Sequence, residues 1–210
     1  MIILIISCGS KKEKKDQALS KKPEKLLIGK KMLMIIPEEN FNETEFSTVK
    51  TTMEEQGALL KVASRISALN IKGMEGMWVT SDLSWERISI DDWDVIILIG
   101  GSGTTKHFED KNLHKLLNDA HEKKKWIAAI CLSPMILAQA GILIGKQATC
   151  FPSIAENLKE MGVKVSNHKV EIDNDAKIIT GNGPKAALLF SFKIVEMISG
   201  KKSEQARENE

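Results

Sequence analysis

Short apolar runs alternate along the chain with segments in which apolar side chains recur every three or four positions. Uninterrupted apolar runs are typical of strands buried on both faces, and the second pattern is typical of amphipathic helices. In the segment 112–123, for example, Leu113, Leu116, Leu117 and Ala120 share one helical face. We predict strands at 32–37, 59–63, 77–80, 95–99, 126–130, near 148, at 170–172 and at 177–180, and helices at 43–56, at 112–123, from 134, at 153–160 and at 184–198. This alternation predicts an α/β domain with a doubly wound, mostly parallel sheet.

Cys131 stands where one of these strands meets a helix. The apolar run 126–130 ends at this cysteine, and Pro134 then marks the first turn of the next helix, where its missing N–H costs little. Open α/β sheets place ligands at the carboxyl ends of their strands, and free N–H groups at a helix start stabilise a thiolate. Cys131 is therefore a candidate nucleophile on a sharp strand-to-helix turn.

A glycine-rich turn, 100–103, follows another apolar strand. It does not match the dinucleotide-binding fingerprint, because it follows a middle strand and lacks the third glycine of that pattern. Glycines also permit a close approach of bare backbone. We expect the N–H of Gly101 to point at a small anion beside Cys131, with Gly100 and Ser102 in the pocket.

The first 31 residues differ in composition from the rest. The apolar run 1–6 ends at Ser7 and Cys8 and is followed by a lysine-rich stretch. This arrangement resembles a bacterial-type lipoprotein signal with Cys8 as the lipidated residue. We interpret 1–31 as a lipoprotein-like leader and tether, 32–200 as a single domain and 201–210 as a polar tail. The lipid at Cys8 would be the only membrane contact and would hold the domain outside the cytoplasm. The alternative is a cytoplasmic protein with an N-terminal extension.

Charge and cysteine content exclude several function classes. The formal net charge of +2 divides into +6 for residues 1–31, 0 for 201–210 and therefore −4 for the body. The mixed charges of the body, without an arginine-rich or aromatic-rich strand, argue against a nucleic-acid partner. Three cysteines in 210 residues do not make a disulfide framework. The four histidines have no ligand partners at metal-binding spacing, so we predict no metal and no other cofactor, and place His114 and His121 on a solvated helix face.

Several segments resemble the PfpI family. The resemblance covers about residues 32–199 and rests on 94–101, on 127–131 with Pro134, on 149–152 and on 179–184. It implies a flavodoxin-like three-layer α/β/α sandwich with a cysteine nucleophile elbow, related to the class I glutamine amidotransferase domain, and a homodimer. It also implies that Cys131 is the nucleophile and that its acidic partner on the first helix is Glu45, with Glu43 as the second choice. The backbone N–H groups of Gly101 and Leu132 would be the oxyanion donors.

Positions at which the chain departs from the family pattern narrow the range of activities that we expect. Protease-type members have a histidine directly after the cysteine, and Leu132 stands there in this chain. Without an adjacent base we expect no peptide hydrolysis. The human member of the family has a histidine at the position that Phe151 occupies here, so we place the Phe151 side chain in the pocket. His168 and Glu171 lie one residue too far apart for an amidotransferase triad.

A cysteine paired with a carboxyl group still supports chemistry. We expect the buried carboxyl of Glu45 to stay protonated beside a thiolate, to donate a hydrogen bond to it and so to lower the pKa of Cys131. The pair could add sulfur to a reactive aldehyde and move a proton between neighbouring carbons. The resemblance thus implies a glutathione-independent glyoxalase or deglycase that takes a small carbonyl substrate. The alternative is a non-catalytic redox-sensing, chaperone-like or ligand-binding protein in which Cys131 is only oxidised.

Overall fold

The apolar runs form the middle of a seven-stranded sheet. The computed structural model describes residues 24–202, so Cys8, most of the leader and most of the tail lie outside the described residues. The strand order is β10-β11-β7-β6-β1-β2-β5, and only the β10–β11 pair is antiparallel. The strands of this sheet are β1 (Lys31–Ile35), β2 (Leu59–Ser64), β5 (Leu83–Ser84), β6 (Val95–Leu98), β7 (Trp126–Ile130), β10 (Val170–Asp173) and β11 (Ile178–Gly181).

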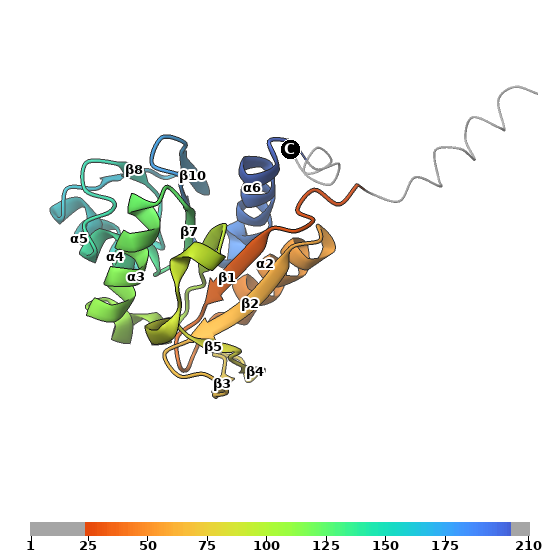
Figure 1. The fold of residues 1–210 in the computed structure, drawn as a ribbon. Coiled ribbons are helices and arrows are strands. Elements are labelled where there is room, and N and C mark those ends of the chain that lie inside the picture. The colour runs from red at the N-terminus through yellow and green to blue at the C-terminus, as the bar shows by residue number, and fades with distance from the viewer. Residues whose placement is uncertain (1–23, 203–210) are drawn as a thin grey trace, which may run out of the picture.

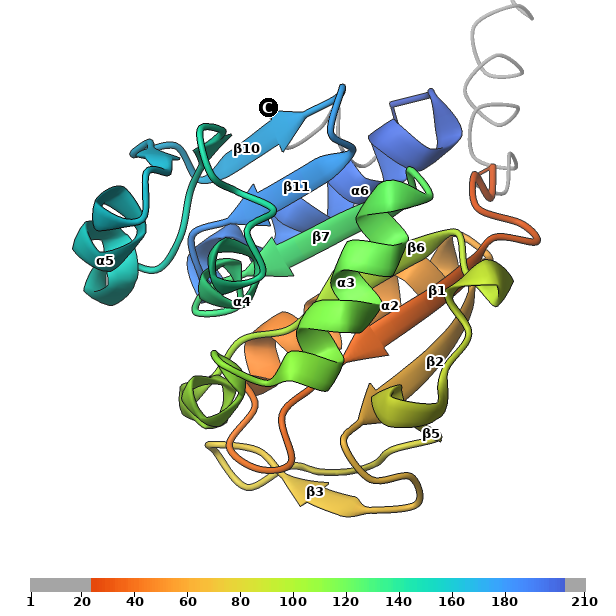
Figure 2. The same cartoon turned by 60° about the vertical axis from the view of Figure 1, so that its left-hand side comes forward.

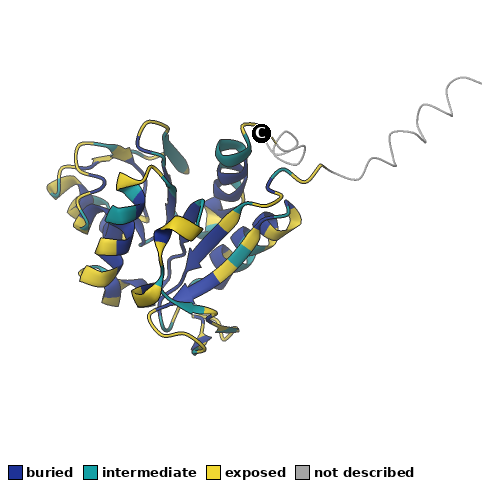
Figure 3. Ribbon diagram, in the orientation of Figure 1, coloured by how far each residue is buried: buried dark blue, intermediate teal, exposed yellow. Residues whose placement is uncertain are grey.

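Helices cover both faces of the sheet (Figures 1 and 2). The α-helices are α2 (Glu43–Glu55), α3 (Lys111–Glu122), α4 (Pro134–Gln139), α5 (Ala155–Glu160) and α6 (Ala187–Ser199). One apolar cluster joins the sheet to α2 and α6, and a second joins it to α3, α4 and α5. Figure 3 shows that residues of the central strands are buried, as expected for strands that are covered on both faces. The prediction of a flavodoxin-like α/β sandwich is confirmed.

The described part of the chain also contains two short strand pairs and five turns of 3-10 helix. The pairs are antiparallel β3 (Asn70–Lys72) with β4 (Trp78–Thr80), and parallel β8 (Gln147–Ala148) with β9 (Lys164–Val165). The 3-10 turns are η1 (Trp85–Arg87), η2 (Ile90–Asp92), η3 (Ser102–His107), η4 (Pro152–Ile154) and η5 (Pro184–Ala186). The sequence pattern gave no sign of β3, β5 or β9, because each is too short to show a period.

Our placement of His114 on a solvated helix face is wrong. Its side chain is 6% exposed, and Nε2 donates a 2.7 Å hydrogen bond to the carbonyl of Phe108. The carbonyl one turn before the helix satisfies the ring, so that a polar side chain can face the interior. His121 is half-buried. None of the helices within residues 24–202 is long and apolar enough to cross a membrane.

Candidate functional site

Cys131 occupies the turn between β7 and α4. Its φ of +66° is left-handed, a conformation that costs a non-glycine residue about 1 to 3 kcal/mol. Two backbone hydrogen bonds hold the turn: the N–H of Cys131 donates to the carbonyl of Gly181 at 2.9 Å, and the N–H of Phe151 donates to the carbonyl of Cys131 at 2.8 Å. Pro134 then begins α4, as its position in the sequence indicated. The side chain of Cys131 is buried as a free thiol.

Glu45 reaches Cys131 from the first turn of α2. The helix begins after Asn42, whose Oδ1 accepts a 3.0 Å hydrogen bond from the N–H of Glu45. The carboxyl of Glu45 is completely buried, and its Oε2 accepts a 2.9 Å hydrogen bond from the N–H of Gly100. The thiol of Cys131 is hydrogen bonded to the same carboxyl. The structure therefore brings together the two side chains that the resemblance to the PfpI family implied as a pair.

Gly100 makes this approach possible. A Cβ atom at residue 100 would lie 2.5 Å from Cβ of Cys131, 2.9 Å from Oε2 of Glu45 and 3.0 Å from the carbonyl oxygen of Ile130. Only a hydrogen atom fits between these groups. The absence of a side chain at this position thus lets the thiol and the carboxyl meet.

Burial raises the pKa values of both groups. Desolvation raises the pKa of Glu45 to about 7, although the hydrogen bonds from Gly100 and Cys131 oppose the rise. Desolvation and the charge of Glu45 raise the pKa of Cys131 well above its usual range. Our expectation of a lowered thiol pKa is therefore wrong, because a carboxylate of Glu45 repels a thiolate. The pair is left with a single negative charge above neutral pH, and that charge belongs to the pair as a whole.

Two backbone N–H groups face the sulfur of Cys131. Those of Leu132 and Gly101 each lower the pKa of the thiol, although less than burial raises it. Gly101 has a φ of +125°, and its Cα packs against the backbone of residues 40–42, where a side chain would clash. Backbone donors held in this way stabilise negative charge on sulfur or on an oxygen bound beside it.

The other residues that we expected in the pocket are Glu43, Ser102 and Phe151, and they differ in orientation and exposure. Glu43, the second choice for the acid, turns away from Cys131: its Oε1 accepts hydrogen bonds from the N–H groups of Glu75 at 2.5 Å and Met77 at 3.4 Å. Ser102 is exposed at the start of η3. Phe151 follows Cys150, which is buried, and its ring is 39% exposed and packs near Gly183. Glu43 therefore supports a neighbouring loop, and Glu45 alone of the two lies at the thiol.

No histidine contributes to the electrostatics of Cys131 within the described residues. His168 is exposed and lies 2.6 Å from Glu171, Nδ1 to Oε1, and His107 is buried beside Trp85. These are not the positions of a base beside the sulfur. Among residues 24–202 no group of three or more metal-binding side chains converges.

The sequence reasoning missed the cap of α2. Asn42 starts the helix and fixes its first turn, and an asparagine three residues before Glu45 is a recognisable N-cap signal. It also missed Thr180, whose Oγ1 accepts a 2.9 Å hydrogen bond from the N–H of Thr149 in the segment that leads to Phe151. No short-range pattern links residues that lie 31 positions apart.

Comparison with known proteins decides the family. The model of the DJ-1/PfpI family matches residues 30–197. The chain belongs to the DJ-1/PfpI family. It is 28% identical over 171 residues to the glutathione-independent glyoxalase DJR-1.2 of Caenorhabditis elegans, covering 81% of this chain and 90% of the relative. It is 27% identical over 143 residues to a deglycase of Pyrococcus abyssi, covering 68% and 86%.

A solved structure of a DJ-1 protein has the same fold. The crystal structure of Drosophila melanogaster DJ-1beta superposes with a TM-score of 0.76 at 29% identity, covering 86% of this chain and 95% of that one. The fold is thus that of the DJ-1/PfpI family, while the activity has to be argued from the site.

Proposed function

We propose that this DJ-1/PfpI protein is a cysteine-dependent, glutathione-independent glyoxalase that acts on small 2-oxoaldehydes. The observation that carries the proposal is the hydrogen-bonded pair of Cys131 and Glu45, with one shared negative charge and a carboxyl pKa near 7. An acid or base with a pKa near the working pH transfers protons in both directions. Relatives named glyoxalase and deglycase make this chemistry the first to test.

The proposed reaction begins with addition of sulfur to the aldehyde carbon. The thiol proton passes to the carboxylate of Glu45 as the carbon–sulfur bond forms, and the N–H groups of Gly101 and Leu132 stabilise the new oxyanion. Glu45 then returns the proton to that oxygen, which gives a neutral hemithioacetal and a carboxylate again.

Glu45 next acts on carbon. Its carboxylate removes the hydrogen of the hemithioacetal carbon and delivers a proton to the neighbouring ketone carbon, while the hydroxyl proton of the first carbon moves to the oxygen of the second. The first carbon is thereby oxidised and the second is reduced. The product is a thioester of a 2-hydroxy acid on Cys131. Water hydrolyses it, and the balance is one 2-oxoaldehyde plus one water giving one 2-hydroxy acid.

The test is turnover of methylglyoxal by the full chain without glutathione or added metal. We expect Cys131→Ser and Glu45→Gln each to remove turnover, because one lacks the nucleophile and the other lacks the proton carrier. Cys150→Ser is the matched control, since this cysteine is also buried but belongs to the opposite apolar cluster. The proposal fails if the parent has no turnover, or if Glu45→Gln keeps it.

The second candidate is a redox sensor. It is favoured by the free, buried Cys131 beside a carboxyl that is protonated below pH 7 and could donate a hydrogen bond to a sulfinate. Here two molecules of hydrogen peroxide would each supply one oxygen atom to the sulfur and be reduced to water. If the parent shows no turnover of methylglyoxal and hydrogen peroxide rapidly oxidises Cys131, this candidate is favoured.

We also propose a location and an assembly. Lipidation at Cys8 would place the domain outside the cytoplasm, and Cys8→Ser should then move the full chain from the membrane fraction to the soluble fraction of bacterial cells. If parent and variant fractionate alike, the leader is an extension of a cytoplasmic protein. A homodimer is the expected assembly, and the mass by analytical ultracentrifugation tests it.

A further inference from the structure

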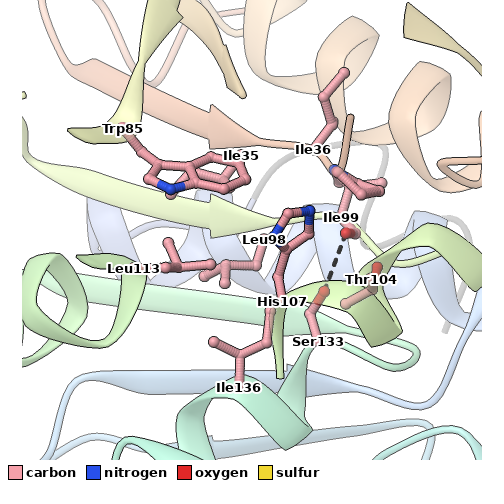
Figure 4. Close-up of a pocket in the computed structure, with 11 residues that line it drawn as sticks. Ile35, Ile36, Trp85, Leu98, Ile99, Thr104, His107, Leu113, Ser133 and Ile136 are labelled. Carbon is pink, nitrogen blue, oxygen red and sulfur yellow. Dashed lines mark hydrogen bonds between the residues drawn. The ribbon is translucent and has the colours of Figure 1, made fainter. Parts of the chain in front are cut away.

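A small cavity lies under η3, on the side of the sheet that α3 covers (Figure 4). Its walls come from the carboxyl ends of β1 and β6, from η3 and from the start of α4. The space open to the centre of a water molecule is about 10 Å³. That is the size required for one ordered water.

Polar atoms in the wall lack a protein partner. Within the described residues, Oγ1 of Thr104 and Nε2 of His107 are buried and make no hydrogen bond, and these side chains are only 2% and 5% exposed. Ser133 is different, because its hydroxyl donates a 3.0 Å hydrogen bond to the carbonyl of Ile99. In Figure 4 the imidazole of His107 lies between the indole of Trp85 and the side chain of Thr104. A buried polar atom without a hydrogen-bond partner lowers the stability of the fold, so we expect these two atoms to bind a ligand.

The surroundings of the imidazole indicate what that ligand must donate. Nδ1 lies 3.6 Å from Oδ2 of Asp110, and this nearest carboxylate favours the tautomer that carries the ring proton on Nδ1. Burial lowers the pKa of His107, although the charges of Glu38 and Asp110 oppose the shift. Nε2 of the neutral ring is then an acceptor, and it lies 3.8 Å from Oε2 of Glu38, another acceptor. One water molecule can donate a hydrogen to each of these acceptors and so bridge them.

We propose that one water molecule occupies this cavity, bound to Nε2 of His107, to Oγ1 of Thr104 and to the carboxylate of Glu38, which lies beside Nε2 but does not line the cavity. Thr104 and His107 are thereby positioning residues for the site at Cys131. The water donates one hydrogen to Nε2 and one to the carboxylate, and accepts the hydroxyl hydrogen of Thr104. All three polar groups are then satisfied without a charge on the ring.

The position of these residues in the chain explains the effect on Cys131. Thr104 and His107 belong to η3, which begins directly after Gly101, the donor that faces the sulfur. Glu38 belongs to the loop that leads to Asn42 and Glu45. The water therefore joins the segment carrying the N–H donor to the segment carrying the carboxyl. Direct hydrogen bonds also join these segments: the N–H of Gly103 donates to the carbonyl of Asn40 at 3.3 Å, and the N–H of Asn42 donates to the carbonyl of Gly100 at 2.9 Å.

A crystal structure of the full chain at high resolution tests the bound water directly. We expect one ordered water within hydrogen-bond distance of Nε2 of His107 and Oγ1 of Thr104. A cavity without density, or Nε2 in direct contact with Glu38, would overturn the proposal.

Matched threonine variants test the positioning role. Thr104→Val keeps the shape and removes the hydroxyl, so we expect iodoacetamide to alkylate Cys131 about threefold more slowly or worse, because the N–H of Gly101 is less well placed. Thr104→Ser keeps the hydroxyl and should react like the parent. Thr51→Val, at an exposed position of α2, is the control for the substitution itself. The peptide containing Cys131 is followed by mass spectrometry, which separates it from the other cysteines.

Each remaining outcome counts against the proposal. Equal rates in Thr104→Val and the parent remove the positioning role, and a Thr104→Ser rate as slow as that of Thr104→Val assigns the effect to the methyl group. If Thr104→Val does not fold, the Thr104→Ser rate and the crystallographic water decide. The positioning role rests on the proposed function of Cys131, but alkylation and the water need no turnover. A failure of the glyoxalase proposal is therefore distinguishable from a failure of this one.

Discussion

The backbone N–H of Gly100 donates a 2.9 Å hydrogen bond to Oε2 of Glu45, so the turn after β6 holds the carboxyl that faces Cys131. Glu45 is carried by the helix after β1, and Cys131 by the turn after β7. Three neighbouring strands, β1, β6 and β7, thus deliver one carboxyl, one backbone donor and one thiol to the same edge of the sheet. The site depends on close packing of these turns.

Gly100→Ala should disrupt the pair without removing either partner. Its Cβ would meet Cβ of Cys131 at 2.5 Å, so one of the turns must move. We expect a loss of stability of about 1 to 3 kcal/mol, as for other overpacked sites, and a large loss of Cys131 alkylation rate. Denaturant unfolding and peptide mass spectrometry measure the two effects.

The control for this substitution is Gly145→Ala. Gly145 has a φ of +75° but no atom within 4 Å of the position of a Cβ, so only backbone strain is added. It should cost about 1 kcal/mol and leave the alkylation rate unchanged. Equal alkylation in Gly100→Ala and the parent would show that the approach of the two side chains tolerates a methyl group.

Stability should fall with rising pH because of Glu45. The pKa of this carboxyl is raised from its ordinary value of 4.5 to about 7, so the folded chain binds the proton more tightly than the unfolded chain. The folded state therefore carries more protons between these values, and the contribution to stability that is present below pH 4.5 is lost as the pH rises through 7. The full loss is about 3 kcal/mol.

Glu45→Gln removes this pH dependence. The amide is neutral at every pH, so the variant should match the parent near pH 4.5 and exceed its free energy of unfolding above pH 7. Denaturant unfolding across this range gives the variant-minus-parent difference, in which other groups cancel. The exposed Glu160→Gln should give a flat difference. A flat difference for Glu45→Gln as well would mean that folding does not raise the pKa of Glu45, so that its carboxyl is already ionised at acid pH in the folded chain.

The sequence predicted the parts of the site that depend on strand ends. Cys131 and the turn of Gly100 and Gly101 directly follow apolar runs, and the carboxyl ends of parallel strands share one edge of a sheet. Glu45, by contrast, was assigned through the resemblance to the PfpI family. It did not predict the direction of the thiol pKa, because that depends on how much water the folded turns exclude. Nor did it predict that Glu43 faces the β3–β4 turn, since two carboxylates two positions apart on a helix differ only in the face they occupy.

Thr180 should stabilise the segment that supports the elbow. Its hydroxyl oxygen accepts the N–H of Thr149, and both groups are buried. Thr180→Val keeps the shape and leaves that N–H without a partner, which costs about 1 to 3 kcal/mol. Thr180→Ser keeps the acceptor and should lose much less. If both variants lose the same free energy of unfolding, packing of the methyl group is responsible.

The left-handed backbone of Cys131 makes an unusual prediction about glycine. Replacing a residue by glycine normally costs about 0.5 to 1 kcal/mol relative to alanine, because the unfolded chain gains freedom. At a φ of +66°, however, alanine is itself strained by about 1 to 2 kcal/mol. Cys131→Gly should therefore be as stable as Cys131→Ala or more so, although both lack the sulfur.

Cys150 supplies the matched comparison for this prediction. It is buried to the same degree as Cys131, but its φ is not positive. Cys150→Gly should be less stable than Cys150→Ala, so the sign of the glycine-minus-alanine difference should reverse between the two cysteines. Denaturant unfolding of the four variants measures it. The same sign at both positions would mean that the turn at residue 131 relaxes to a right-handed backbone once the sulfur is gone, and hence that contacts of the sulfur help to hold it.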